Sequence, residues 1–376
     1  RFGLARGRQA FQVDGVFRFW GNAPVEIVGG GVGLVDALFA AAERAGVEVW
    51  YGTRATRLIT GPNGGIAGVQ VSREGRPMTL SARAVVLACG GFEANPEMRA
   101  RYLGPGWDLA LVRGTEYNTG DGIRMALECG AQPYGHWSGC HAVAWDVNAP
   151  PGGGDRQVGE GYQKHSYPFG IVVNRLGKRF VDEGADFRNY TYARYGREIL
   201  RQPDMVAFQI FDQKVTHLLR DEYRIPQVTR VRADTLEDLA RGLQIDPRGL
   251  VETVRAFNAA IDTEKPFNPT IKDGRCTVGI DPPKSNWALA LDTPPYEGYA
   301  VTVGITFTFG GLRVNPEAQV LDMEDRPIPG LFAAGELVGG LFYDNYAGGT
   351  GLTSGAVFGR TAGRNAAGRN AAAGSR

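Results

Sequence analysis

A glycine-rich turn near the start of the chain is the first feature that suggests ligand chemistry. In VEIVGGGVGLVDALFAAAERAGVEVWYG, Val25 to Gly52, a predicted strand meets a predicted helix at Gly29, Gly31 and Gly33. A dinucleotide-binding βαβ unit needs G-x-G-x-x-G at this turn and an acidic residue after its second strand. Here the third glycine comes one place early, and the second strand, Val47 to Tyr51, ends without a carboxylate. We therefore predict a loop and helix entry here and expect the main phosphate cradle elsewhere.

A second glycine pair follows a predicted buried strand. Ala84 to Ala88 is continuously apolar, as expected of a strand covered on both faces of a sheet, and it leads into Gly90-Gly91. Glycines at the carboxyl end of a strand allow a ligand to approach the backbone closely. Further on, DGIRMALECG predicts a helix that begins near Asp121 and stops at a glycine.

Composition excludes several classes of protein. The chain has 376 residues, a formal net charge of +1, 22% charged residues and no long Lys/Arg run, which argues against a nucleic-acid partner. No apolar run approaches the length of a membrane span, so we expect a cytoplasmic protein that does not itself span a membrane. The four cysteines are far apart in sequence, which predicts reduced thiols and no metal site.

The pattern of elements predicts two domains, one inserted into the other. Residues 47–97 show strand, turn, strand, turn, strand, and glycine-rich strands and loops return from Val301 onward. Between them, residues 136–299 are richer in aromatic and charged residues and include the helical segments TLEDLARGL and GLVETVRAFNAAI. We predict an α/β fold in which 136–299 is inserted between 1–135 and 300–376.

Three blocks of sequence carry a more specific signal. They are AVVLACGGFEANPEM (Ala84 to Met98), NTGDGIRMALECGA (Asn118 to Ala131) and GGLRVNPEAQVLDMEDRPIPGLFAAGELVGGLFYDNYAGGTGLTSGAVFGRTAG (Gly310 to Gly363). Together they resemble the flavoproteins of the succinate dehydrogenase and fumarate reductase family, and the third looks like that family's flavin-end segment almost from end to end. The resemblance implies FAD as cofactor, a Rossmann-like FAD-binding domain in 1–135 and 300–376, and an α+β substrate cap in 136–299.

The same resemblance implies that the FAD-binding domain is partial. Family members begin with a βαβ unit that carries G-x-G-x-x-G, and Gly29 to Gly33 is similar to a later segment of the family. The pyrophosphate cradle would then lie upstream of Arg1, and we expect the chain as given to bind FAD poorly.

The flavin-end segment also implies cofactor contacts. GLFAAGE predicts a strand that ends at Gly335-Glu336, where the Glu336 carboxylate can accept hydrogen bonds from ribose or ribityl hydroxyls of FAD; a surface helix-cap carboxylate is the alternative. GGTGLTSGAVFGR predicts a helix from about Thr353, whose N-terminus suits the flavin N1/C2 edge. The predicted cofactor-binding residues are Ala88, Gly90, Gly91, Thr119, Gly120, Asp121, Gly335, Glu336, Gly351, Leu352 and Thr353.

Both charged substrate clamps of the fumarate reductases are replaced in this chain. The family's N-R-x-G-G reads Asn345-Tyr346-Ala347-Gly348-Gly349, and its G-x-H-x-T-x-G-G reads GITFTFGG from Gly304 to Gly311. A phenol or a hydroxyl cannot replace a bidentate guanidinium, which argues against simple fumarate or succinate chemistry. We expect Tyr346 and Thr306 in the active site in place of these clamps.

Within the family, the sequence looks most like the tricarballylate dehydrogenase branch, whose relatives include the flavoprotein part of a precorrin-3B synthase. The blocks that carry this resemblance are GITFTFGGL, DNYAGGTGLTSGAVFGR, YGHWSGCHAVAWD and GKRFVDEGADFRNYTYA. It implies dehydrogenation of a small tricarboxylate, tricarballylate, to cis-aconitate by hydride transfer to FAD N5. The electrons would then pass to an electron-transfer partner protein, which can be membrane-bound.

Arg188 is the predicted proton relay or carboxylate clamp. The fumarate reductases carry their relay arginine in R-F-x-x-E-x-x-x-R, and the run from Arg179 to Arg188 has one extra residue after Glu183. Because a guanidinium is not normally deprotonated, the relay would need coupling to Asp186 or Glu183; a structural ion pair is the alternative role of Arg188. His141, at the end of GHWSGCH, is predicted to hydrogen-bond a substrate carboxylate.

Two other functions stay open. A 3-ketosteroid dehydrogenase also places tyrosine near the flavin and lacks the arginine clamp, but it would be expected to present an apolar cap. Cations in the predicted cap favour a polyanionic substrate: His141, Arg156, Lys164, His165, Arg175, Lys178, Arg179 and Arg188. The other possibility is a catalytically silent fragment or an assembly subunit that meets an electron-transfer partner.

Overall fold

The computed structural model describes residues 4–6, 10–13, 16–19, 25–153, 155 and 157–373. Contacts group the chain into two units. The first contains Arg1–Tyr51, His165–Asn189 and Phe208–Ala300; the second contains Gly52–Lys164, Tyr190–Ala207 and Val301–Arg376. Each unit mixes helices and strands, as predicted for an α/β protein. The assignment of 1–135 with 300–376 to the cofactor and of 136–299 to the substrate stays a prediction.

Strands of the first unit pair in small groups. β1 (Leu4–Arg6) pairs with β4 (Val25–Ile27), and β2 (Ala10–Val13) pairs with β3 (Val16–Phe19). β11 (Ile171–Val173) runs antiparallel to β12 (Ala207–Phe211). β13 (Arg230–Ala233) pairs with the first residues of the long strand β14 (Tyr296–Leu312).

Helix α1 (Gly30–Arg44) begins directly after Gly29, in the glycine-rich segment that follows β4. Gly29 has a φ of 79°, and a Cβ on Gly33 would lie 2.0 Å from the carbonyl oxygen of Val28, so both positions require glycine. The predicted helix entry is therefore confirmed, but the helix begins at Gly30, so Gly31 and Gly33 belong to its first turns and not to a loop. The strand predicted for Val47 to Tyr51 is wrong: these residues form coil and a turn, and their side chains are exposed. Alternating apolar residues do not form a strand where no neighbouring strand pairs with them.

The helices of the predicted insertion form as expected. α5 (Leu236–Leu243) and α6 (Pro247–Ala259) match TLEDLARGL and GLVETVRAFNAAI. The Thr235 side chain accepts a hydrogen bond from the Asp238 N–H and thereby caps α5, and Asp246 caps α6 in the same way. α4 (Arg188–Leu200) continues from the first unit into the second.

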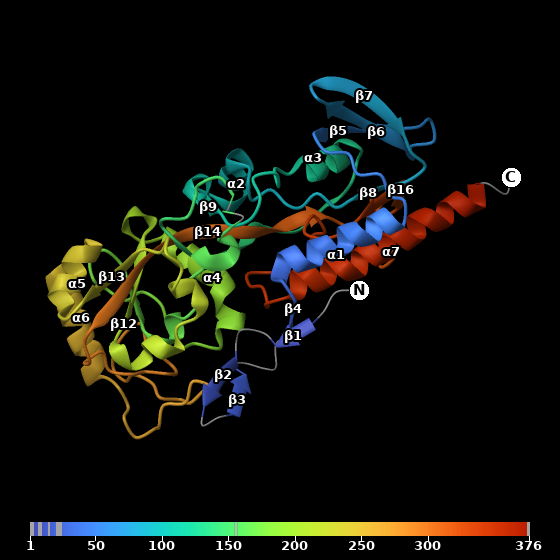
Figure 1. Cartoon of the computed structure of the whole chain (residues 1–376). Helices are drawn as coiled ribbons and strands as arrows, with labels where there is room; N and C mark the ends of the chain where they lie inside the picture. The colour runs from blue at the N-terminus through green and yellow to red at the C-terminus, as the bar shows by residue number, and fades with distance from the viewer. Residues whose placement is uncertain are drawn as a thin grey trace. The chain divides into compact units, whose positions relative to one another are not determined.

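Two sheets of the second unit do not include the long strand β14. β5 (Thr53–Thr60), β6 (Ile66–Arg73) and β7 (Arg76–Ser81) form an antiparallel meander (Figure 1). β16 (Pro327–Ala333) pairs antiparallel with β15 (Gln319–Leu321) and parallel with β8 (Val85–Leu87). β8 is the strand predicted before the Gly90-Gly91 pair, although its Val86 is 38% exposed, so it is not covered on both faces as expected.

The central strand of the second unit is the later part of β14. β10 (Pro133–Asp146) pairs antiparallel with it, with a register irregularity between His141 and Ala142, and β9 (Leu111–Val112) pairs parallel with it at Gly304 and Ile305. These two neighbours bring segments from about 110, 140 and 305 in the chain together. The short 3-10 helices are η1 (Trp107–Leu109), η2 (Gly159–Tyr162), η3 (Tyr167–Phe169), η4 (Pro203–Met205), η5 (Gln213–Leu218) and η6 (Asp221–Tyr223).

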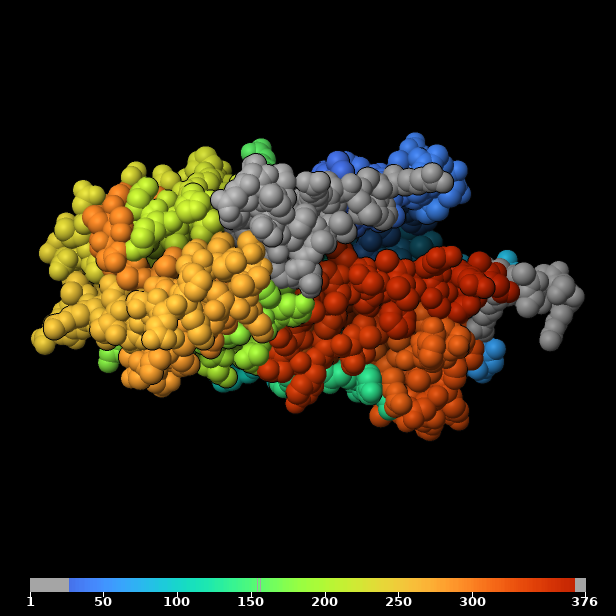
Figure 2. All heavy atoms as spheres, turned by 90° about the horizontal axis from the view of Figure 1, so that it is seen from below, coloured from blue at the N-terminus to red at the C-terminus, as the bar shows by residue number. Residues whose placement is uncertain are grey.

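Three helices complete the second unit: α2 (Pro96–Leu103), α3 (Asp121–Glu128) and α7 (Thr350–Ala373). α7 lies at the surface on the face shown in Figure 2, where it is red, and its Leu352 and Val357 side chains are exposed. In the part of the chain that the structure describes, no helix combines the length and the apolar character needed to cross a bilayer.

Candidate functional site

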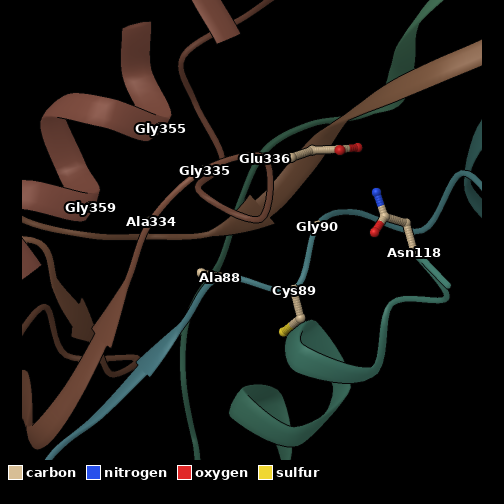
Figure 3. Close-up of a pocket in the computed structure, with 9 residues that line it drawn as sticks. All are labelled: Ala88, Cys89, Gly90, Asn118, Ala334, Gly335, Glu336, Gly355 and Gly359. Atoms are coloured by element: carbon tan, nitrogen blue, oxygen red, sulfur yellow. The ribbon is translucent and has the colours of Figure 1, made fainter. Parts of the chain in front are cut away.

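A pocket of about 410 Å³ lies in the second unit, at the carboxyl ends of the parallel strands β8 and β16 (Figure 3). Its lining comes from three segments far apart in sequence: Ala88, Cys89 and Gly90 after β8, Asn118 before α3, and Ala334, Gly335, Glu336, Gly355 and Gly359 from the C-terminal part. Four of the predicted cofactor-binding residues, Ala88, Gly90, Gly335 and Glu336, are thus brought together around one cavity.

The glycines keep this pocket open. Gly335 has a φ of 83°, and a Cβ built on it or on Gly359 would meet no atom within 4 Å, so a larger side chain at either position would extend into open space. At Gly90, by contrast, a Cβ would lie 2.4 Å from the Asn118 side chain. At Gly335 and Gly359 the lining therefore offers backbone atoms and open space to a ligand, whereas Gly90 has no room for a side chain.

Two carboxyl groups meet at the pocket. Glu336 accepts hydrogen bonds from the Thr308 N–H at 2.7 Å and from the Thr308 hydroxyl at 3.2 Å. Burial, and then the charge of Glu93 and a hydrogen bond with it, hold the pKa of Glu336 well above its usual range. Glu93 is itself buried and receives a hydrogen bond from the Asn118 amide. Burial of both carboxyls thus favours the protonated form of Glu336.

The remaining predicted cofactor residues lie near these segments. The Gly120 N–H donates to the carbonyl oxygen of Gly91, which joins the segment after β8 to the segment before α3. Thr119 donates through its hydroxyl to Asp121, and Asp121 forms an ion pair with Arg54 at 2.9 Å, so the Asp121 carboxylate is already engaged within the unit. Figure 3 shows the Cys89 side chain directed toward the first turn of α3.

The predicted helix after the glycine loop begins slightly earlier than expected. α7 starts at Thr350, so Gly351, Leu352 and Thr353 belong to its first turn. The Gly351 N–H donates to the Tyr346 hydroxyl oxygen at 2.9 Å, and this bond satisfies one of the N–H groups that a helix start leaves open.

A second group of side chains surrounds His141. Its ring stacks on Tyr346 with centroids 4.5 Å apart and meets the edge of Tyr192 at 4.9 Å. Tyr346 also contacts Phe342 and Phe307. His141 is 3% exposed, and neither ring nitrogen has a hydrogen-bond partner among the described residues. Burial, and then the charge of Arg113, hold the pKa of His141 well below its usual range, so the ring is neutral.

Arg113 is a site residue that the sequence analysis missed. It directly follows β9, and its side chain donates to the Thr306 hydroxyl at 3.1 Å and to the Glu160 carboxylate. Burial alone would lower its pKa, but Glu160 and then the neighbouring Tyr192 and Tyr346 shift the pKa upward, so Arg113 stays cationic. The structure thus brings His141, Tyr346 and Thr306 into the surroundings of one guanidinium.

Arg188 belongs to the first unit. It is 8% exposed and contacts the Nδ1 atom of His165 at 3.2 Å. The two acids predicted as its partners have other contacts: Glu183 forms an ion pair with Arg179 at 2.6 Å, and Asp186 lies 3.4 Å from Lys272.

Several cations that suggested a polyanionic substrate have structural partners. Lys164 lies 3.6 Å from Asp146, and both are fully buried. Arg179 pairs with Glu183, and Arg175 donates to the carbonyl oxygen of Gln244. Lys178 is exposed, and Arg156 lies outside the described residues. The number of cations in the segment is therefore not by itself evidence for a polyanion.

Other lining residues were also missed, and some carried a signal. Gly355 and Gly359 are four residues apart in a predicted helix, which puts them on one face. Asn118 stands directly before the recognised TGDG run. Arg113 carried no such signal, because its site contacts depend on the pairing of β9 with β14, some 190 residues away in sequence.

Comparison with known proteins identifies the family. The FAD binding domain family matches residues 15–352. "Probable fumarate reductase Ifc3" of Shewanella frigidimarina is 30% identical over 338 residues, which is 89% of this chain and 53% of that protein. A 3-oxosteroid 1-dehydrogenase of Mycobacterium tuberculosis is 30% identical over 366 residues, 89% of this chain and 62% of that protein. The chain thus spans between half and two thirds of the length of these relatives.

A solved structure shows the same fold. The open conformation of a flavocytochrome c3 fumarate reductase has 28% sequence identity and a TM-score of 0.71, over 94% of this chain and 60% of that one. The predicted Rossmann-like fold of the flavoproteins is thereby confirmed.

The pocket residues suit the cofactor that the family name implies. A flavin dinucleotide needs close approach to backbone, which the open positions at Gly335 and Gly359 allow, and acceptors for its hydroxyls, which the Glu336 carboxyl offers. Behind the lining residue Asn118, the buried Glu93 Oε2 atom has no hydrogen-bond partner within the described residues. This chain is a member of the FAD binding domain family of succinate dehydrogenase and fumarate reductase flavoproteins.

Proposed function

We propose that the protein is an FAD-dependent oxidoreductase that removes two hydrogens from adjacent carbons of a polycarboxylate, with tricarballylate as substrate and cis-aconitate as product. One observation supports it most: β14 contributes neighbouring residues to both sites, since Thr308 bonds the pocket carboxyl of Glu336 and Phe307 packs on Tyr346 beside His141. A cofactor in the pocket would therefore lie close to the group around His141.

The cofactor side of this proposal uses the predicted residues. Glu336 and the backbone at Gly90 and Gly335 would hold FAD, with the first turn of α7 toward the flavin edge. When bound, FAD supplies the acceptor for the substrate hydride. Because burial favours the protonated form of Glu336, this carboxyl can both donate to and accept from sugar hydroxyls.

The substrate side uses the group around His141. Because this imidazole is neutral and buried with both nitrogens unengaged, it can donate to a carboxylate without adding a charge. Thr306 and Tyr346 provide further hydroxyls at the same place. We assign to Arg188, which contacts Nδ1 of His165, a second carboxylate contact or a proton relay. As a relay, the guanidinium would have to give one of its own protons to a base such as His165 as it takes the substrate proton. Electrons leave the reduced protein to an electron-transfer partner.

A 3-ketosteroid is the second candidate substrate, and a specific observation favours it. Phe307, Phe309, Phe342 and Tyr346 form a continuous aromatic cluster with centroid separations of 4.8 to 6.3 Å. Such a wall suits an apolar ring system as well as it suits the flavin. The polycarboxylate is preferred because the cation of Arg113 donates to Thr306, next to Phe307 in β14, and lies close enough to Tyr346 to interact with it electrostatically.

The test is reduction of the protein-bound flavin. The protein is purified with FAD and mixed anaerobically with tricarballylate, succinate or 4-androstene-3,17-dione, and the flavin absorbance is followed. Bleaching by tricarballylate alone supports the proposal. Bleaching by the steroid alone replaces it with the second candidate, and bleaching by neither refutes both. The flavin-to-protein ratio is measured first, since the sequence predicts weak binding.

A further inference from the structure

We propose that Arg113 binds a carboxylate of the substrate and that Glu160 is a counter-ion which this carboxylate displaces. The inference rests on the proposed function and adds to it the residue that replaces the missing clamps. In the fumarate reductases, which this sequence resembles, the charged clamps belong to the motifs that contain Tyr346 and Thr306 in this chain. In the structure a guanidinium reaches Thr306 from a different strand.

The position of Arg113 is fixed by the backbone. β9 runs parallel to β14, and the Arg113 N–H donates to the carbonyl oxygen of Ile305 at 2.8 Å. The side chain then lies over Trp145, with the guanidinium carbon 5.8 Å from the ring centroid, and donates from Nη1 to Thr306. A guanidinium held by a strand, a ring and a hydroxyl loses little further freedom when it binds an anion.

The counter-ion is held less firmly than the cation. The Arg113 side chain is 12% exposed, whereas that of Glu160 is 61% exposed and comes from the four-residue 3-10 helix η2. An exposed carboxylate is easily taken up by water when it leaves the pair, and an incoming carboxylate keeps the buried guanidinium paired. A substrate carboxylate enclosed beside Arg113 can therefore take the place of Glu160.

The surroundings of Arg113 suit a carboxylate better than another cation or a purely apolar group. His141 offers a neutral imidazole with both nitrogens unengaged, and Tyr192 and Tyr346 lie close enough to affect the pKa of Arg113. A carboxylate that meets a guanidinium and a further N–H or O–H donor is strongly bound. The same second unit provides all of these groups.

The chain contains a matched arginine that serves as a control. Like Arg113, Arg313 pairs with an exposed acid, Asp325, and lies over an aromatic ring, that of Tyr134, at 5.1 Å. Arg313 donates a further hydrogen bond to the side chain of Gln132. Arg313 is neither one of the residues that line the pocket nor one of those that surround His141. A general effect of losing a half-buried ion pair should therefore appear equally in both arginines.

The experiment measures binding rather than turnover. Citrate is the probe, because its central carbon carries no hydrogen and it cannot be dehydrogenated there. Titration calorimetry and the flavin difference spectrum of the full-length holoenzyme give its Kd. We expect Arg113→Gln to raise this Kd about 100-fold and Glu160→Gln to lower it several-fold. Arg313→Gln and Asp325→Asn should leave the Kd of citrate unchanged. None of the four variants should change the Kd of 4-androstene-3,17-dione.

The outcomes separate the two proposals. If citrate binds and tricarballylate bleaches the flavin, but Arg113→Gln changes the citrate Kd no more than Arg313→Gln does, Arg113 is not the clamp and the proposed function stands. If the holoenzyme binds no citrate and is not bleached by tricarballylate, the polycarboxylate function fails, and the role of Arg113 fails with it. Should Arg113→Gln not fold, Glu160→Gln decides in comparison with Asp325→Asn, because a counter-ion of the citrate site tightens binding more on its removal than an acid elsewhere in the unit does.

Discussion

Replacing Glu93 with Gln should make the stability of the folded protein less dependent on pH. Glu93 and Glu336 are coupled carboxyls at the pocket, and the pKa of Glu336 is raised by burial, then by the charge of Glu93 and the hydrogen bond with it. The substitution keeps the size of the side chain and its hydrogen-bonding ability but removes its charge. The pKa of Glu336 should then return part of the way toward its usual range.

The size of the effect follows from proton linkage. A carboxyl whose pKa is raised by folding stabilises the folded state fully below its unfolded pKa, about 4.3, and this contribution is lost as the pH rises through the folded pKa. Within that window, each proton held by the folded state and released on unfolding lowers the free energy of unfolding by about 1.4 kcal/mol per pH unit. Wild type should therefore lose stability from pH 5 upward, and Glu93→Gln should lose less.

Urea unfolding at several pH values between 5 and 8, followed by circular dichroism, measures this slope. Glu97→Gln is the control, because the Glu97 side chain is 71% exposed on α2. Infrared difference spectra test the same idea directly, since a protonated carboxyl has a C=O stretch that an ionised one lacks. Equal slopes for wild type and Glu93→Gln, with no protonated carboxyl at pH 7, would refute the coupling.

Three other substitutions test separate parts of the site. Gly359→Leu should fill the pocket and abolish flavin binding in the full-length protein, whereas Gly363→Leu, an exposed position on the same helix, should retain it; the flavin-to-protein absorbance ratio measures both. Tyr346→Phe leaves the Gly351 N–H without its acceptor and should lower the free energy of unfolding by about 1 kcal/mol, measured by urea unfolding. Arg188→Ala should abolish bleaching by tricarballylate while flavin binding is kept, and Arg188→Lys should restore little of it if a planar guanidinium is required.

The pocket could be predicted from the sequence because its parts are marked locally. Gly90 follows an apolar run and Gly335 precedes a glutamate at a strand end, and each pattern alone predicts a strand terminus open to a ligand. The parallel pairing of Leu331 with Val85 then brings the two termini together. The resemblance placed both segments in one domain, but neither it nor the periodicity predicted the pairing itself.

Charge was much harder to interpret from the sequence. Cations such as Lys164 and Arg179 suggested a polyanion site, yet their partners Asp146 and Glu183 are buried with them. Whether a charge is available to a ligand depends on the exposure and identity of its partner, and neither is visible in a one-dimensional pattern.

The site around His141 shows why the loss of a motif does not show the loss of a function. The sequence argued against simple fumarate chemistry because Tyr346 and Thr306 stand where clamps would be. β9, however, delivers Arg113 to the hydroxyl of Thr306 from another part of the chain. An anion site requires a cation at a point in space, and any strand that reaches the point can supply it. A clamp that moves from β14 to β9 would meet the substrate from a different direction, so it would select a polycarboxylate of different shape and not simply restore the binding of fumarate.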